Sequence, residues 1–145
     1  MYLPAQLITM WMLLYFFLTH HVPLGCLNNL TNPATQAQWR STAAGVIPGV
    51  LVLACLEYGN RVAVVLGAVW LWLWFGLQVR QWWVPYLFGE TALHGDFSWY
   101  RAGGYDRTAR ILPARGGRPT PDLQHMLLQA LTLSAALVTT LTVVS

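Results

Sequence analysis

Apolar residues are arranged along this chain in four long runs separated by shorter polar stretches. The runs extend from Leu3 to Leu18, from Ala43 to Tyr58, from Val62 to Leu77 and from Leu123 to Val144. An α-helix rises about 1.5 Å per residue, so roughly 20 apolar residues cross the hydrocarbon core of a bilayer. The pattern predicts four transmembrane helices, over residues 3–22, 42–58, 61–80 and 121–144.

The composition agrees with a membrane protein. Hydrophobic residues make up 56% of the chain and charged residues only 9%, which is too apolar a balance for an ordinary soluble domain. The first run has no Lys or Arg before it, and a cleaved signal peptide normally begins with such a positive segment. We therefore expect the first run to be a retained helix, and residues 1–145 to form a single all-α integral membrane domain, a four-helix up-down bundle.

Local signals predict where the helices begin and end. Gly59 and Asn60 separate the second and third runs, and this pair is typical of a tight turn between two helices. The order Thr120, Pro121, Asp122 predicts an N-cap, a first-turn proline and an acidic residue at the start of the last helix.

The third helix is followed by aromatic and then polar sequence. The pair Val84-Pro85 predicts a break or bend, which leaves the segment from Gln81 to Phe88 as an aromatic belt at the membrane interface. Residues 89–120 are rich in glycine and arginine and predict a long irregular loop.

The positive charges are distributed unevenly over this topology. The chain has no lysine, and seven of its eight arginines fall in the connections that an up-down bundle places at one face: Arg40, Arg80, Arg101, Arg107, Arg110, Arg115 and Arg118. Only Arg61 falls at the other face. The positive-inside rule makes the arginine-rich face cytoplasmic and puts both termini on the non-cytoplasmic side of a plasma or inner membrane.

Small residues on the second helix predict a close helix contact. Gly45 and Gly49 form a GxxxG motif, which lets another helix approach the backbone. Two alternatives remain open, namely packing within the chain and contact between copies in a homo-oligomer.

Polar residues form a stripe along the last helix. Asp122, His125, Gln129 and Thr132 recur at three- and four-residue steps and therefore share one face of the helix. Such a face avoids lipid, because an unpaired polar group in hydrocarbon costs several kcal/mol. The stripe indicates either hydrogen bonds between helices or a polar pathway or ligand pocket.

The loop of residues 89–120 carries five arginines, which suit phosphate groups: Arg101, Arg107, Arg110, Arg115 and Arg118. They indicate contact with anionic lipid headgroups or, alternatively, a dedicated phosphate site. The phosphate-binding pattern GxxxxGK[ST] is absent from the sequence.

All four histidines are expected near the cytoplasmic face. His20, His21, His94 and His125, together with Asp96, form a candidate ligand set for a divalent metal. A second arrangement places a haem between His125 and either His20 or His21. In an enzyme, His94 and His125 are the candidates for acid–base work.

These features support three hypotheses about function. The first is a non-enzymatic oligomeric or accessory subunit, part of a homo-oligomer or larger membrane complex, whose arginine-rich loop contacts anionic lipid or a partner. The second is a small channel or transporter that uses the polar stripe. The third is a membrane-embedded enzyme acting on a lipid or quinone, or a metal or haem protein. Nothing in the sequence suggests nucleic-acid binding.

Overall fold

The computed structural model describes residues 2–28, 30, 36–92, 94 and 96–144, with the side chains of the second long helix described from Trp39 onward. These residues form helices and loops, without a strand among them. The elements are α1 (Leu3–His21), η1 (Gly25–Leu27), α2 (Gln36–Tyr58), α3 (Arg61–Phe88), α4 (Ser98–Ala102), η2 (Tyr105–Arg107) and α5 (Leu123–Val144). Helices α1, α2, α3 and α5 are long and apolar enough to cross a membrane, so the all-helical class and four candidate spans are confirmed.

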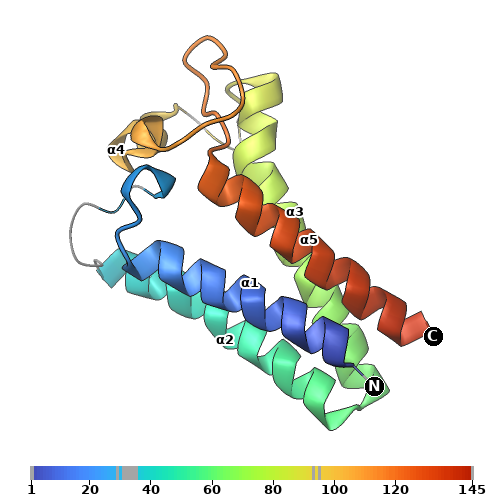
Figure 1. Ribbon diagram of the computed structural model, residues 1–145. Coiled ribbons are helices and arrows are strands. Elements are labelled where there is room, and N and C mark those ends of the chain that lie inside the picture. Colours follow the sequence, from blue (N-terminus) through green and yellow to red (C-terminus); the bar gives the residue numbers. More distant parts are fainter. Residues whose placement is uncertain (1, 29, 31–35, 93, 95, 145) are drawn as a thin grey trace.

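Each long helix packs against two others. Helix α1 contacts α2 and α5, and α3 contacts the same two helices. Figure 1 shows the two chain termini and the α2–α3 turn at one end of the molecule, and α4 with the long loop at the other. We call these the terminal end and the loop end.

The centre of the bundle is filled by fully buried side chains from all four long helices. Met12, Leu56, Val64, Leu71 and Ala135 are each at most 1% exposed. In a lipid environment such contacts stabilise the bundle through close packing rather than through the hydrophobic effect.

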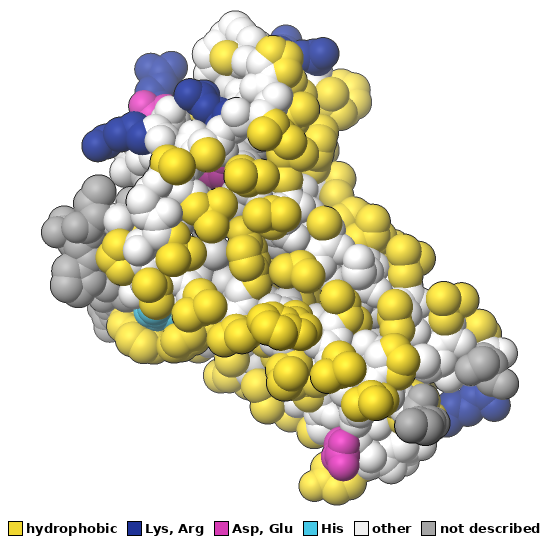
Figure 2. Space-filling view, viewed as in Figure 1, with side chains coloured by type: hydrophobic (Ala, Val, Ile, Leu, Met, Phe, Trp, Pro, Cys, Tyr) yellow, Lys and Arg dark blue, Asp and Glu magenta, His cyan; other side chains and the backbone are white. Residues whose placement is uncertain are grey.

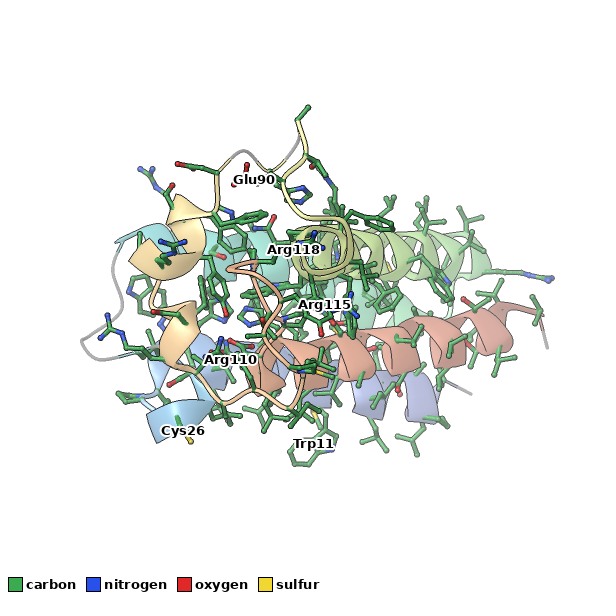
Figure 3. All side chains as sticks on the ribbon, turned by 90° about the horizontal axis from the view of Figure 1, so that it is seen from above. Trp11, Cys26, Glu90, Arg110, Arg115 and Arg118 are labelled. Carbon is green, nitrogen blue, oxygen red and sulfur yellow. The ribbon has the colours of Figure 1, made fainter. Side chains whose placement is uncertain are left out.

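Large apolar side chains also cover the outside of the bundle. Trp11, Val62, Leu66 and Leu141 are all exposed, and Figure 2 shows hydrophobic side chains over much of the visible face between the two ends. Trp11 points away from the helices in Figure 3. An apolar surface of this extent is typical of a protein that faces lipid or a partner.

The turn between α2 and α3 has the predicted form. Gly59 adopts a left-handed conformation with φ of 66°, which glycine reaches without steric cost. The Asn60 side chain accepts hydrogen bonds from the backbone N–H groups of Val62 and Ala63, at 3.0 and 3.3 Å. Asn60 is therefore the N-cap of α3.

Two helices extend beyond the membrane spans that the sequence predicted. Helix α2 begins at Gln36 rather than residue 42, and α3 continues to Phe88 rather than ending at residue 80. Of the break or bend predicted at Val84-Pro85, the break does not occur, because Pro85 lies in the last turn of α3, where it removes a single backbone donor. Tyr86 holds that turn in place, since it is buried and donates its hydroxyl to the Pro113 carbonyl oxygen at 3.2 Å.

The start of α5 and the long loop also differ from expectation. Helix α5 begins at Leu123, and Asp122 caps it by accepting a hydrogen bond from the His125 backbone N–H at 2.9 Å. The hydroxyl of Thr120, the predicted N-cap, is buried and has no partner within the part of the chain that the structure describes. The carboxylate is the stronger acceptor and replaces the hydroxyl in this role. The loop of residues 89–120 is only partly irregular, because it contains α4 and η2.

Candidate functional site

A cavity of about 520 Å³ lies towards the loop end. Its lining comes from every long helix and from the long loop: Phe16 and His20 on α1, Ser41, Ala44 and Gly45 on α2, Trp70, Trp74, Leu77, Gln78, Arg80, Gln81 and Trp82 on α3, Trp99 and Tyr105 in the loop, and His125 and Leu128 on α5. We call it the histidine–tryptophan cavity. Its volume lies within the range of roughly 300–1,000 Å³ that is usual for small-molecule sites.

Aromatic rings packed over a glycine form one wall of the cavity. A Cβ atom at Gly45 would lie 2.6 Å from Phe16 Cε1 and 2.9 Å from Trp74 Cζ2, so only glycine fits beneath these rings. Phe16 and Trp74 meet edge to face, with ring centroids 5.3 Å apart. The two rings occupy the space between α1 and α3, and the cavity lies beside them.

His125 is held by a buried carboxylate. Asp122 is fully buried and accepts three hydrogen bonds, from His125 Nδ1 at 2.6 Å, from the His125 backbone N–H at 2.9 Å and from Thr108 Oγ1 at 2.7 Å. An ionised carboxylate only accepts, so His125 Nδ1 carries a proton and Nε2 is the ring nitrogen available to a ligand. The imidazole lies against Trp82, with ring centroids 3.9 Å apart.

His20 is oriented in the same way by a backbone group. Its Nδ1 atom lies 2.9 Å from the Phe16 carbonyl oxygen, which can only accept a hydrogen bond. Nδ1 therefore carries the proton, and Nε2 of the neutral ring keeps a free lone pair. Both histidines thus offer an Nε2 atom without a hydrogen-bond partner among the described residues.

Two residues that line the cavity also carry a buried polar atom without a partner within the described chain. Gln78 donates its Nε2 to Thr132 Oγ1 at 3.1 Å, but its Oε1 is buried and unpaired. Trp70 Nε1 is also buried and unpaired, and both residues line the cavity. A buried polar atom without a partner costs about 1–3 kcal/mol, and these two atoms have almost no surface open to the cavity.

Most of the polar stripe on α5 is used for helix packing. Gln129 Oε1 accepts from Trp83 Nε1 at 2.7 Å, and Thr132 Oγ1 accepts from Gln78. Gln129 and Thr132 are both buried. At Gln129 and Thr132 the stripe therefore forms hydrogen bonds between α3 and α5. His125, which belongs to the same stripe, lines the cavity instead.

The candidate metal ligands are dispersed. His21 Nε2 is 2.9 Å from Thr42 Oγ1, His94 Nδ1 is 2.9 Å from Thr91 Oγ1, and Asp96 accepts from Ser98 at 2.8 Å. Nowhere in the described part of the chain do three His, Cys, Asp or Glu side chains form a group able to hold a metal ion. Of the predicted set, only His20 and His125 share the cavity.

The GxxxG motif serves contacts within the chain. A Cβ atom at Gly45 would meet Phe16, and one at Gly49 would meet the Leu13 side chain. Phe16 and Leu13 belong to α1, so the two glycines let α1 pack closely on α2. This is the intramolecular alternative of the two that the sequence left open.

The five loop arginines lie at the loop end but do not converge on one site. Arg110 donates to the Asp106 carbonyl oxygen at 2.9 Å, Arg115 lies over the Tyr86 ring at 5.0 Å, and Arg118 donates to the Leu87 carbonyl oxygen at 3.0 Å. Figure 3 shows these three arginines spread around the loop. A hollow of about 680 Å³ is lined by Arg101 and Arg118, but also by the acidic Glu90 and Asp96.

Sequence reasoning missed the central part played by Trp82. It was assigned to an interfacial belt, but it is only 4% exposed and makes edge-to-face contacts with Trp99, Tyr100 and Tyr105. The three aromatic residues in the loop could have predicted this packing, because large aromatic side chains do not stabilise a loop that is fully exposed to water. They fold back over the end of α3, and Trp99 and Tyr105 line one side of the cavity.

Comparisons with known proteins leave the site to be interpreted from its own geometry. No protein family, curated protein or solved structure matches this chain.

Proposed function

We propose that this protein is a small membrane-embedded binding protein, non-enzymatic in itself, that holds the ring or headgroup of a bilayer-borne amphiphile in the histidine–tryptophan cavity. The observation that carries the proposal is a cavity of about 520 Å³ that is lined from all four long helices and by two histidines whose Nε2 atoms have no hydrogen-bond partner among the described residues. Aromatic walls with a few polar groups are typical of small-molecule sites.

The proposal includes an orientation in the membrane, with an up-down bundle and the loop end in the cytoplasm. Arg101, Arg107, Arg110 and Arg115 are exposed at the loop end, and Figure 2 shows most of the visible positive side chains there. Arg61 begins α3 at the terminal end and donates to the Val143 carbonyl oxygen. Each basic residue near an anionic leaflet contributes about 1 kcal/mol of attraction, which favours this orientation.

Anionic lipid is the partner we propose for the loop. The arginines are spread over the surface, an arrangement that suits many headgroups better than a single phosphate. A homo-oligomer or a larger complex requires a face other than Gly45 and Gly49, since these glycines are occupied by α1.

The binding function is tested by blocking the cavity. Protein purified in lipid nanodiscs is extracted, and its small molecules are identified by mass spectrometry. We expect a stoichiometric amphiphile with the natural chain, and its loss from Ala44→Trp, because Ala44 lines the cavity. Ala130→Trp is the matched control, since Ala130 is exposed on α5 and is not among the lining residues. Equal amphiphile content in the two variants would contradict the proposal.

The orientation is tested by cysteine labelling in intact cells. Cys26 and Cys55 are first replaced by serine, and single cysteines are introduced by Ile111→Cys or Tyr58→Cys, both at exposed positions. A membrane-impermeant maleimide should label position 58 in intact cells, and position 111 only after permeabilisation. The opposite pattern overturns the orientation and leaves the binding function to its own test.

A further inference from the structure

We infer that the ligand of the histidine–tryptophan cavity is a flat ring bearing two hydroxyl groups, of the hydroquinone class, whose hydroxyls donate hydrogen bonds to Nε2 of His20 and Nε2 of His125. The inference rests on the proposed binding function and deepens it. It depends on which ring nitrogen of each histidine carries the proton, which the neighbouring acceptors decide.

In their neutral forms, both histidines are hydrogen-bond acceptors through Nε2. The Phe16 carbonyl oxygen and the Asp122 carboxylate accept hydrogen bonds from the Nδ1–H groups of His20 and His125, at 2.9 and 2.6 Å. A neutral imidazole has only one N–H group, so its Nε2 atom accepts. A ligand with two O–H donors satisfies both nitrogens, whereas an oxidised quinone, whose carbonyls only accept, leaves both unpaired.

Gln78 and Trp70 carry buried polar atoms beside the cavity that its ligand does not reach. The Oε1 atom of Gln78 is buried without a partner in the described chain, and Gln78 lines the same cavity. Its amide orientation is set by the donation of Nε2 to Thr132 at 3.1 Å. Trp70 Nε1 is likewise buried without a partner in the described chain, so the polar contacts of the ligand depend on the two histidines.

The walls favour a flat ring over a sugar or an alkyl alcohol. Phe16, Trp74, Trp82 and Tyr105 all line the cavity. Offset or edge-to-face contact between aromatic rings adds about 0.5–1.5 kcal/mol beyond the area buried. An aromatic diol combines such ring contacts with two hydroxyl donors for the two histidines.

The opening of the cavity indicates that the ligand comes from the bilayer. Ala44 on α2 and Leu77 on α3 line the cavity and are also exposed on the outer surface. A ring with an apolar tail can therefore lie inside while its tail passes between α2 and α3 into lipid. This matches the amphiphilic character of membrane hydroquinones.

The test compares one ring in two oxidation states. A decyl-substituted benzohydroquinone and the corresponding benzoquinone are titrated anaerobically by calorimetry into the nanodisc-embedded protein. We expect the hydroquinone to bind at least about tenfold more tightly, which corresponds to about 1.4 kcal/mol for one retained hydrogen bond.

Variants assign the binding to the two nitrogens. His20→Phe and His125→Phe keep an aromatic ring and should each weaken hydroquinone binding at least about tenfold, while His94→Phe, which lies outside the cavity, should not change it. Ala44→Trp blocks the cavity from the opposite wall and should abolish binding, so the test remains decisive if one histidine variant fails to fold. A monodisperse elution profile and an unchanged melting temperature identify folded variants.

The remaining outcomes separate the inference from the proposed function. Equal or tighter binding of the benzoquinone overturns the hydroquinone assignment and leaves the binding function standing. A Soret absorbance band that disappears in both histidine variants overturns it in favour of haem held by the same two nitrogens. The absence of any cavity-dependent amphiphile overturns both.

Discussion

The terminal end and the loop end of the bundle are built from the same four helices but pack by different means. Towards the terminal end, small side chains from α1 and α5 meet in the core, and Ala5, Thr9, Ala135 and Ala136 are completely buried. At the loop end, large aromatic side chains lie between the helices and line the histidine–tryptophan cavity. They are Phe16, Trp74 and Trp82 from the helices, and Trp99 and Tyr105 from the loop.

This difference shows how side-chain size divides one bundle into a packed region and a binding region. Small residues allow helix backbones to approach closely, so nearly every atom has a neighbour. Large rigid rings meet edge to face and leave space between them. We therefore expect stability at the terminal end to depend on volume, and stability at the loop end to depend on hydrogen bonds.

The largest predicted effect comes from adding volume beside the packed region. Gly49→Leu places a side chain where even a Cβ atom would meet Leu13, and we expect a loss of about 3 kcal/mol in the free energy of unfolding. The measurement is an SDS titration in mixed micelles. Gly76→Leu is the matched control, because a Cβ atom at Gly76 has nothing within 4 Å. Similar losses in both variants would contradict the division by volume.

The next largest effect is expected at the start of α5. Asp122→Ala removes the N-cap and leaves Thr108 and His125 without their acceptor, so we expect a loss of about 2 kcal/mol. Hydrogen exchange should accelerate at the backbone amides of the first turn of α5. Asp106→Ala, at an exposed position in η2, should change neither measurement. Unchanged exchange in Asp122→Ala would refute the capping role.

A smaller effect is expected from the hydrogen bond between α3 and α5. Gln129→Leu leaves Trp83 Nε1 without its acceptor at 2.7 Å and should cost about 1 kcal/mol, in line with polar contacts between membrane helices. The same SDS titration measures it. Ser134→Ala removes only a bond to the Ala130 carbonyl within α5 and should have almost no effect. If Gln129→Leu changes ligand binding but leaves stability unaltered, the stripe serves the cavity rather than packing.

The smallest change in stability is expected inside the cavity. Ala44→Leu adds volume as Gly49→Leu does, but the cavity has room for it, so the free energy of unfolding should change by less than about 0.5 kcal/mol. Ligand binding should nevertheless weaken. A loss comparable to that of Gly49→Leu would show that the loop end is as closely packed as the terminal end.

Local signals predicted the helices better than their ends. The turn at Gly59 and Asn60 was confirmed because both residues act through their own backbone and side chain. The end of α3 was missed because Tyr86 is held by Pro113 in the loop, far along the sequence. The N-cap of α5 was predicted at the wrong residue because Asp122 also accepts a hydrogen bond from Thr108. No pattern near the start of the helix reveals this partner.

The candidate site shows the same limit. His20 and His21 are neighbours in the sequence, but adjacent residues of a helix point about 100° apart. His20 lines the cavity with His125, whereas His21 bonds to Thr42 and stacks on Trp39. The sequence placed all four histidines near one depth but did not show which of them face one another.

By itself, the sequence determined that four apolar helices are long enough to span a membrane and that arginine is concentrated in the segments joining them. These are properties of segments, and they survive any rotation of a helix about its axis. Only the tertiary structure decided that Gly45 and Gly49 serve α1, that Gln129 and Thr132 pair with α3, and that His20 and His125 share a cavity, with no partner for either Nε2 atom among the described residues. Those outcomes depend on how the helices rotate and how far their side chains hold them apart.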